Sequence, residues 1–169
     1  MKTLVAYWSL TGNTKRVAEA IFQALPGDKI IKPMEEVDSL DAVDLTFVGF
    51  PIMQFGVPRA VRKFLSGQCA GKRVALFVTH AMQSNSDDPQ QQEMLANELE
   101  KCRTACVNSN LEGLFHCQGE LSEKTAAELM ESNIPMLMKF AGMRPSTIGH
   151  PNLEELEQAQ AFAGTIVKS

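Results

Sequence analysis

The chain has 169 residues, of which 44% are hydrophobic and 21% charged, and its formal net charge is −4. This length and composition predict one globular domain, residues 1–169, with a substantial core. No apolar run approaches the roughly 20 residues that span a bilayer, and the N-terminus lacks the regions of a signal peptide, so we expect a cytoplasmic protein without a membrane partner. The charged residues form no basic stripe with interleaved aromatics, which argues against nucleic-acid binding.

The first apolar run, at about residues 2–8, stops at a polar hexapeptide, and a helical pattern follows at 14–25. A helix start leaves its first N–H groups without intrahelical partners and carries partial positive charge. Small polar side chains there add donors, although any one of them is also a common helix cap. This order of strand, turn and helix predicts a phosphate site. The hexapeptide is Ser9-Leu10-Thr11-Gly12-Asn13-Thr14.

The sequence of this loop argues against two classes of nucleotide-binding protein. Neither the lysine-containing P-loop nor the G-x-G-x-x-G turn is present, which disfavours ATP and NAD. The hexapeptide instead resembles the first loop of the flavodoxin family, [ST]-x-T-G-N-T, and it matches at every position. The resemblance implies that residues 9–14, the first loop, wrap the phosphate of flavin mononucleotide (FMN).

The rest of the chain alternates strand-like and helical segments. Strands are expected at 28–32, 44–50, 72–79 and 112–117, and helices at 58–66, 89–107 and 152–167, with a short helical turn at 38–42. Continuous apolar runs indicate strands that are buried on both faces. The pattern predicts an α/β fold: a three-layer, doubly wound, parallel five-stranded sheet in the flavodoxin-like order 2-1-3-4-5. Such a sheet binds its ligand beyond the carboxyl ends of the strands.

The third strand leads into a loop that resembles the second flavin loop of flavodoxin-like proteins, which flanks the isoalloxazine ring. A flat heteroaromatic ring needs an apolar wall and a few polar groups at its edge. Met53 and Phe55 are expected to form the wall, and Gln54 or backbone amides the edge. Packing of Phe55 into the core is the alternative. This second loop is Pro51-Ile52-Met53-Gln54-Phe55-Gly56.

The fourth strand ends in a third loop, Thr79-His80-Ala81-Met82. Many flavodoxins place a tyrosine here against the flavin, but the single tyrosine of this chain is Tyr7. The resemblance therefore leaves His80 or Met82 as the nearest substitutes and implies redox potentials unlike those of tyrosine-stacked flavodoxins. A structural hydrogen bond is the other interpretation of His80.

The fifth strand ends in Phe115-His116-Cys117-Gln118-Gly119, which resembles the F-x-C-Q-G signature of many flavodoxin-like proteins. A helical insertion is expected at about 120–150, between this strand and the last helix, with a helix start at Ser122 and a break at Pro135. Its methionines are expected to pack, with a lid or a partner surface as alternatives. They are Met130, Met136, Met138 and Met143.

The four cysteines, Cys69, Cys102, Cys106 and Cys117, contain no C-x-x-C pair, and no histidine lies at zinc-finger spacing. Metal binding is therefore disfavoured. Cys102 and Cys106 lie four apart on one face of a predicted helix, where a redox-active thiol pair is conceivable. We expect them to be packed thiols, and we expect no catalytic side chain.

The sequence favours an FMN-binding electron-transfer protein that accepts electrons from a reductase and passes them to an acceptor enzyme, as a monomer or homodimer. The alternative is an FMN-dependent NAD(P)H:quinone-type oxidoreductase on the same fold. The mild net charge weakens the carrier interpretation, and the absence of a nicotinamide-binding fingerprint weakens the enzyme interpretation more. A flavin-free module is disfavoured by the intact hexapeptide.

Overall fold

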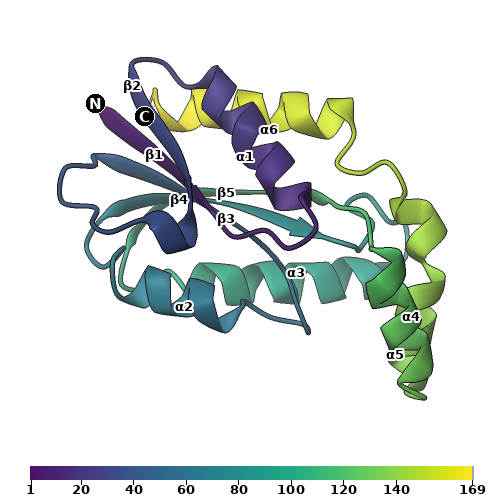
Figure 1. Ribbon diagram of the computed structural model, residues 1–169. Coiled ribbons are helices and arrows are strands. Elements are labelled where there is room, and N and C mark those ends of the chain that lie inside the picture. The colour runs from purple at the N-terminus through teal and green to yellow at the C-terminus, as the bar shows by residue number, and fades with distance from the viewer. Residues whose placement is uncertain (169) are drawn as a thin grey trace.

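A five-stranded parallel sheet forms the centre of the computed structural model, which describes residues 1–168 (Figure 1). The strand order is β2-β1-β3-β4-β5, as predicted. Every adjacent pair is parallel, so all carboxyl ends lie at one edge of the sheet. The strands are β1 Lys2–Tyr7, β2 Asp28–Pro33, β3 Leu45–Pro51, β4 Arg73–His80 and β5 Asn110–Gln118.

Helices cover both faces of the sheet, which explains the continuous apolar runs. Because side chains alternate across a strand, Leu4 and Ala6 of β1 join the core beneath one pair of helices, whereas Val5 joins the core beneath the other. Figure 1 shows these pairs: α1 and α6 on one face, α2 and α3 on the other. Their bounds are α1 Asn13–Ala24, α2 Arg59–Ser66, α3 Pro89–Thr104 and α6 Leu153–Ile166.

Two predicted helical segments differ from the structure. The short helix lies at Met34–Glu36 (η1) and not at 38–42, where the Ser39 hydroxyl accepts a hydrogen bond from the Asp41 N–H and favours a turn. Helix α3 ends at Thr104, before the expected residue 107. Its last turn tightens, because the Cys106 N–H donates to the carbonyl three residues back, and the chain then turns into β5.

The insertion between β5 and α6 folds as two short helices, α4 Glu123–Glu131 and α5 Pro135–Gly142, followed by the 3₁₀ turn η2 Arg144–Thr147. The Ser122 hydroxyl caps α4 by accepting from the Thr125 N–H, and α5 starts at Pro135, so both predicted signals are confirmed. The α4–α5 hairpin extends beyond the carboxyl edge of the sheet (Figure 1).

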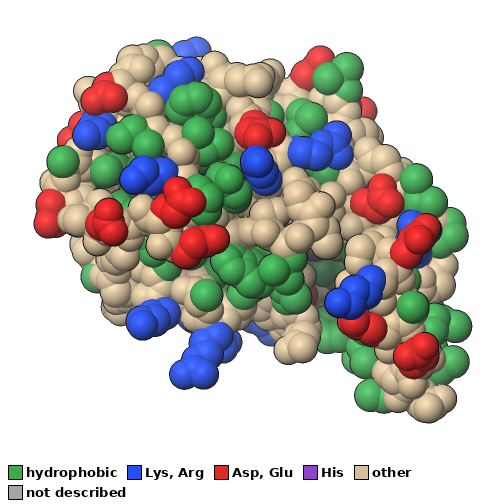
Figure 2. All heavy atoms as spheres, viewed as in Figure 1, with side chains coloured by type: hydrophobic (Ala, Val, Ile, Leu, Met, Phe, Trp, Pro, Cys, Tyr) green, Lys and Arg blue, Asp and Glu red, His purple; other side chains and the backbone are tan. Residues whose placement is uncertain are grey.

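Packing was the wrong expectation for two of the insertion's methionines. Met130 and Met136 are 48% and 53% exposed, and Figure 2 shows hydrophobic side chains gathered at the free end of the hairpin. Met138 and Met143 are half-buried. Within the described part of the chain, no helix has both the length and the apolar character needed to cross a membrane.

Candidate functional site

The loops after β1, β3, β4 and β5 meet around a cleft that encloses about 130 Å³. They are the predicted first, second and third loops, together with the segment between β5 and α4. Segments far apart in the sequence are therefore neighbours here. The described residues that line the cleft are Ser9, Leu10, Thr11, Asn13, Thr14, Pro51, Ile52, Met53, Thr79, His80, Ala81, Gly119, Glu120, Leu121, Ser122 and Thr125.

The first loop turns the chain from β1 into α1 through Gly12, whose φ of +95° would strain most other residues. The Ser9 hydroxyl oxygen accepts hydrogen bonds from the N–H groups of Gly12 (3.2 Å) and Lys15 (3.4 Å). Gly12, the N-cap residue, has no side chain that could cap α1, so the acceptor for the Lys15 N–H in the first turn of the helix is the Ser9 hydroxyl oxygen. The N–H groups of this loop and the helix dipole would stabilise an anion at this end of the cleft.

Two side chains at the start of α1 join the first loop to other strands. Thr14 is 1% exposed, and its hydroxyl shares a 2.8 Å hydrogen bond with the Thr79 hydroxyl at the end of β4. Asn13 donates from Nδ2 to the Glu120 carbonyl oxygen at 2.9 Å. A Cβ at Gly119 would lie 2.8 Å from that Asn13 nitrogen, so glycine leaves room for the contact. These bonds hold three walls of the cleft together.

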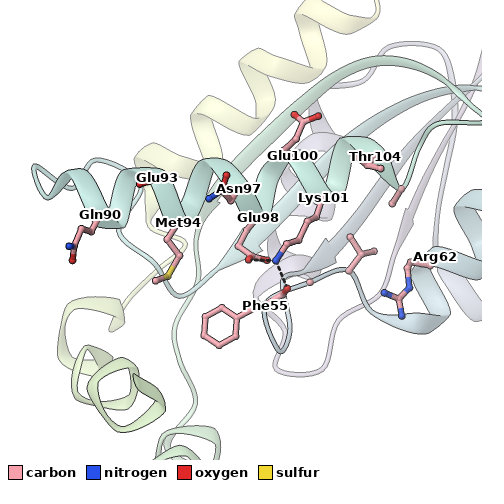
Figure 3. A pocket seen from close by; sticks show the side chains of 13 residues that line it. Phe55, Arg62, Gln90, Glu93, Met94, Asn97, Glu98, Glu100, Lys101 and Thr104 are labelled. Atoms are coloured by element: carbon pink, nitrogen blue, oxygen red, sulfur yellow. Dashed lines mark hydrogen bonds and ion pairs between the residues drawn. The ribbon is translucent and has the colours of Figure 1, made fainter. Parts of the chain in front are cut away.

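The second loop is a two-residue hairpin, in which Met53 and Gly56 exchange two backbone hydrogen bonds of 3.0 Å. Its tip residues, Gln54 and Phe55, have φ values of 49° and 56°, which cost roughly 1 kcal/mol or more each for residues other than glycine. Lys101 of α3 supports this tip by donating from Nζ to the Phe55 carbonyl oxygen at 2.9 Å (Figure 3).

Lys101 is in turn held by a buried carboxylate. Its Nζ lies 2.6 Å from Oε1 of Glu98, a residue that is 4% exposed, while Oε2 of Glu98 has no hydrogen-bond partner among the described residues. The Phe55 ring makes an edge contact with Phe140 of α5, with centroids 6.0 Å apart. Both α3 and the insertion therefore stabilise the second loop. Figure 3 shows Glu98, Lys101 and Phe55 beside a groove of about 930 Å³ between this loop, α2 and α3.

Side chains of β5 hold the third loop. His80 Nδ1 lies 3.0 Å from the Met82 carbonyl oxygen, and His80 Nε2 lies 3.0 Å from His116 Nδ1. Gln118 donates from Nε2 to the Ala81 carbonyl oxygen at 3.2 Å. Two consecutive carbonyl groups of the loop are therefore bound by side chains. Gln118 of β5 binds the Ala81 carbonyl directly, and His80, which is itself bound by His116 of β5, binds the Met82 carbonyl.

The two imidazoles are neutral near pH 7. Burial lowers the pKa of His80 to about 3, and the neighbouring His116 contributes to the shift. Burial also lowers the pKa of His116, helped by the positive charge of Arg103 on α3. His80, expected to substitute for a tyrosine or to make a structural hydrogen bond, makes the hydrogen bonds and also lines the cleft.

Several predicted site residues lie beside the cleft without being among the described residues that line it. Gly12 forms the turn, and Gln54 lies at the hairpin tip. Phe55 and Gly56 line the larger groove. Met82 is 5% exposed and packs in a small core with residues of α3. Of the two residues expected to form a ring wall, the structure places Met53 in the cleft and Phe55 outside it.

The wall that follows β5, formed by residues 119–122 and Thr125, was not predicted from the sequence. Each end of this wall has a recognisable sequence pattern: the F-x-C-Q-G signature ends at Gly119, and the predicted helix starts at Ser122. The contact of Glu120 with the first loop joins positions 107 residues apart, and it left no local pattern.

The four cysteines are free and buried. Burial raises the pKa of Cys69, Cys102 and Cys117 to about 12, and that of Cys106 to about 11. Protonated thiols in the core are poor nucleophiles and poor metal ligands. Among residues 1–168 there is no group of three or more His, Cys, Asp or Glu side chains that could hold a metal ion.

A family model described as a flavodoxin domain matches residues 4–164. The chain belongs to the flavodoxin domain family. Among its relatives is the flavodoxin-like domain-containing protein BilS of Clostridioides difficile strain CD3, which is 29% identical over 174 positions covering 96% of this chain and 94% of the relative.

Solved flavodoxin structures share the fold at low sequence identity. Oxidised flavodoxin 2 from Bacillus cereus has a TM-score of 0.61 at 16% identity, with 99% of each chain covered. A WrbA-like flavodoxin from Agrobacterium tumefaciens has a TM-score of 0.57 at 18% identity, covering 99% of this chain and 95% of that one. Family and fold together support a flavin-binding redox protein.

Proposed function

We propose that this flavodoxin-like protein binds FMN in the cleft and transfers electrons from a reductase to an acceptor enzyme. The observation that carries the proposal is the first loop, whose backbone N–H groups converge at the start of α1 beside a cleft walled by the second and third loops. When bound, FMN would supply the one- and two-electron chemistry. The protein would bind it, orient it and partly exclude water.

The residues present fit the phosphate of FMN. The two N–H groups that donate to the Ser9 hydroxyl oxygen are those that a phosphate oxygen would accept from in its place. The hydroxyls of Ser9 and Thr11 would then turn to donate to the phosphate. No lysine or arginine occurs within residues 9–14, so backbone and hydroxyl donors would carry this recognition.

The cleft also fits one edge of a flavin ring. Its enclosed volume of about 130 Å³ is below the 300–1,000 Å³ of a typical closed ligand site, so part of the ring would remain accessible. Met53 and Ile52 would form an apolar wall, and the third loop would offer backbone groups at the polar edge. An accessible edge suits a protein that exchanges electrons with other proteins.

The alternative, an FMN-dependent NAD(P)H:quinone-type oxidoreductase, is favoured by one observation. A further cavity of about 130 Å³ lies between the second loop, Met82 of the third loop, the start of α3 and α5, and its apolar part would suit a flat apolar electron acceptor. Its apolar lining is Phe55, Met82, Met94, Met136, Phe140 and Met143.

The two functions differ in how the flavin is reduced. Stopped-flow mixing of the FMN-loaded protein with NADH or NADPH is expected to bleach the flavin slowly, and addition of a flavodoxin reductase is expected to accelerate the bleaching. Rapid direct bleaching that continues to turn over with a quinone would contradict the carrier function and support the oxidoreductase. Protein that binds no FMN after reconstitution would contradict both.

A further inference from the structure

Two side chains at the end of β5 make hydrogen bonds that have no part in the phosphate and ring contacts proposed above. His116 and Gln118 are two residues apart, so their side chains leave the same face of the strand. They are registered opposite Val78 and His80 of β4, and both support the chain just beyond that strand. His116 reaches the Met82 carbonyl through His80, and Gln118 reaches the Ala81 carbonyl directly.

The hydrogen bonds of the histidine pair have a defined direction. A carbonyl oxygen only accepts, so His80 Nδ1 must carry the proton that it donates to Met82. In the neutral ring Nε2 then accepts, and His116 Nδ1 must donate to it. Burial lowers the pKa of both rings, helped at His116 by the nearby charge of Arg103, and keeps them in this neutral form. The chain of donors therefore runs from β5 toward the third loop.

These contacts determine which backbone groups the third loop can offer to a ligand. In a trans peptide the C=O of one residue and the N–H of the next point in opposite directions. Because the Ala81 and Met82 carbonyls are bound by Gln118 and His80, the N–H groups of Met82, in the third loop, and of Gln83, the residue after it, point away from these two side chains. Without the two contacts each peptide plane would be free to rotate and present a carbonyl oxygen instead.

We propose that His116 and Gln118 are positioning residues that hold the third loop so that it presents N–H donors, rather than carbonyl oxygens, to the polar edge of the flavin ring. This inference rests on the proposed FMN site. It adds the residues that hold the third loop in the orientation that the flavin ring would need. Neither residue is among the described residues that line the cleft, so both act through the third loop. The F-x-C-Q-G signature thereby has a physical role in this chain.

The test compares variants that remove a donor while preserving size. His116→Leu and Gln118→Met each abolish one support, and each is expected to raise the Kd of FMN and of riboflavin by the same factor, about two- to tenfold. Both variants should also shift the visible absorption and the midpoint potential of the bound flavin. His116→Asn keeps an N–H donor near the position of Nδ1 and should restore the wild-type values.

Cys117→Ala is the matched control, because Cys117 lies between the two residues but packs in the core on the opposite face of the sheet. It should lower the melting temperature and leave the Kd, the spectrum and the potential unchanged. The inference is overturned if His116→Leu and Gln118→Met behave like this control, or if His116→Asn fails to restore the flavin properties. Wild-type protein that binds neither flavin would overturn the proposed function as well, so the two failures are distinguishable.

Discussion

The two ends of the cleft are built in different ways. The proposed phosphate end, residues 9–14, offers backbone N–H groups and hydroxyls that lie within a few positions along the chain. The proposed ring end, residues 51–56 and 79–82, depends on side chains from α3, α5 and β5 that are far away in sequence. The groups that would bind the phosphate therefore lie within one local motif, although Asn13 and Thr14 join that motif to distant elements. The groups of the ring end are held by distant side chains throughout.

The largest effect is expected at the phosphate end from Gly12→Val. A β-branched residue at a φ of +95° is strained by about 1–2 kcal/mol, and the distorted loop loses charge-assisted hydrogen bonds to the phosphate. We expect FMN affinity to fall by about 3 kcal/mol, roughly a hundredfold. Riboflavin affinity should fall far less. Fluorescence-quenching titrations with both flavins measure these affinities. Equal losses of affinity for FMN and riboflavin would contradict a phosphate-specific role of this end of the cleft.

Acid is expected to destabilise the ring end through its histidines. Because burial lowers the pKa of His80 to about 3, the unfolded chain binds a proton first as the pH falls below about 6.5. The free energy of unfolding should drop between pH 6.5 and 5 by up to about 1.4 kcal/mol per pH unit for His80, with a further contribution from His116. Urea titrations check this, with a His80→Asn, His116→Leu double variant as control. A double variant with the wild-type slope would contradict the assignment.

Lys101→Met tests the support of the second loop. It removes the donor to the Phe55 carbonyl and leaves the buried carboxylate of Glu98 without its cation, so we expect a loss of about 1–3 kcal/mol in the free energy of unfolding. FMN and riboflavin should be weakened equally. Glu100→Gln, which breaks the exposed pair with Arg103, is the control and should cost under about 0.5 kcal/mol. Weaker binding of FMN alone would be inconsistent with a role at the ring end.

The smallest effect on the site is expected from replacing Cys102 and Cys106 with Ala. Cys102 of α3 and Cys106 just after it pack in the core between the sheet and the α2–α3 pair, away from the cleft, so flavin content and reduction should stay unchanged while the melting temperature falls modestly. Loss of flavin or of a thiol-dependent redox signal in this double variant would show that these cysteines take part in flavin binding or in redox chemistry.

The same contrast explains what could be predicted from the sequence. The strands β3 and β4 are buried on both faces and read as continuous apolar runs, and the first loop is a local motif, so both were recognisable. The placement of Phe55 outside the cleft depends on Lys101, 46 positions away, and on Phe140. The contacts of Asn13 and Gln118 likewise require the completed sheet, which no window of sequence contains.

The ratio of the Kd values for riboflavin and FMN tests the phosphate site most directly, when it is measured for the wild type and for Ser9→Ala and Thr11→Val. We expect wild-type protein to bind FMN much more tightly than riboflavin. Each variant should lower that ratio while leaving the Kd of riboflavin nearly unchanged, because each charge-assisted hydrogen bond to phosphate contributes about 1.5–3 kcal/mol. A wild-type ratio near one, or variants that weaken both flavins equally, would contradict the assignment of residues 9–14 to the phosphate.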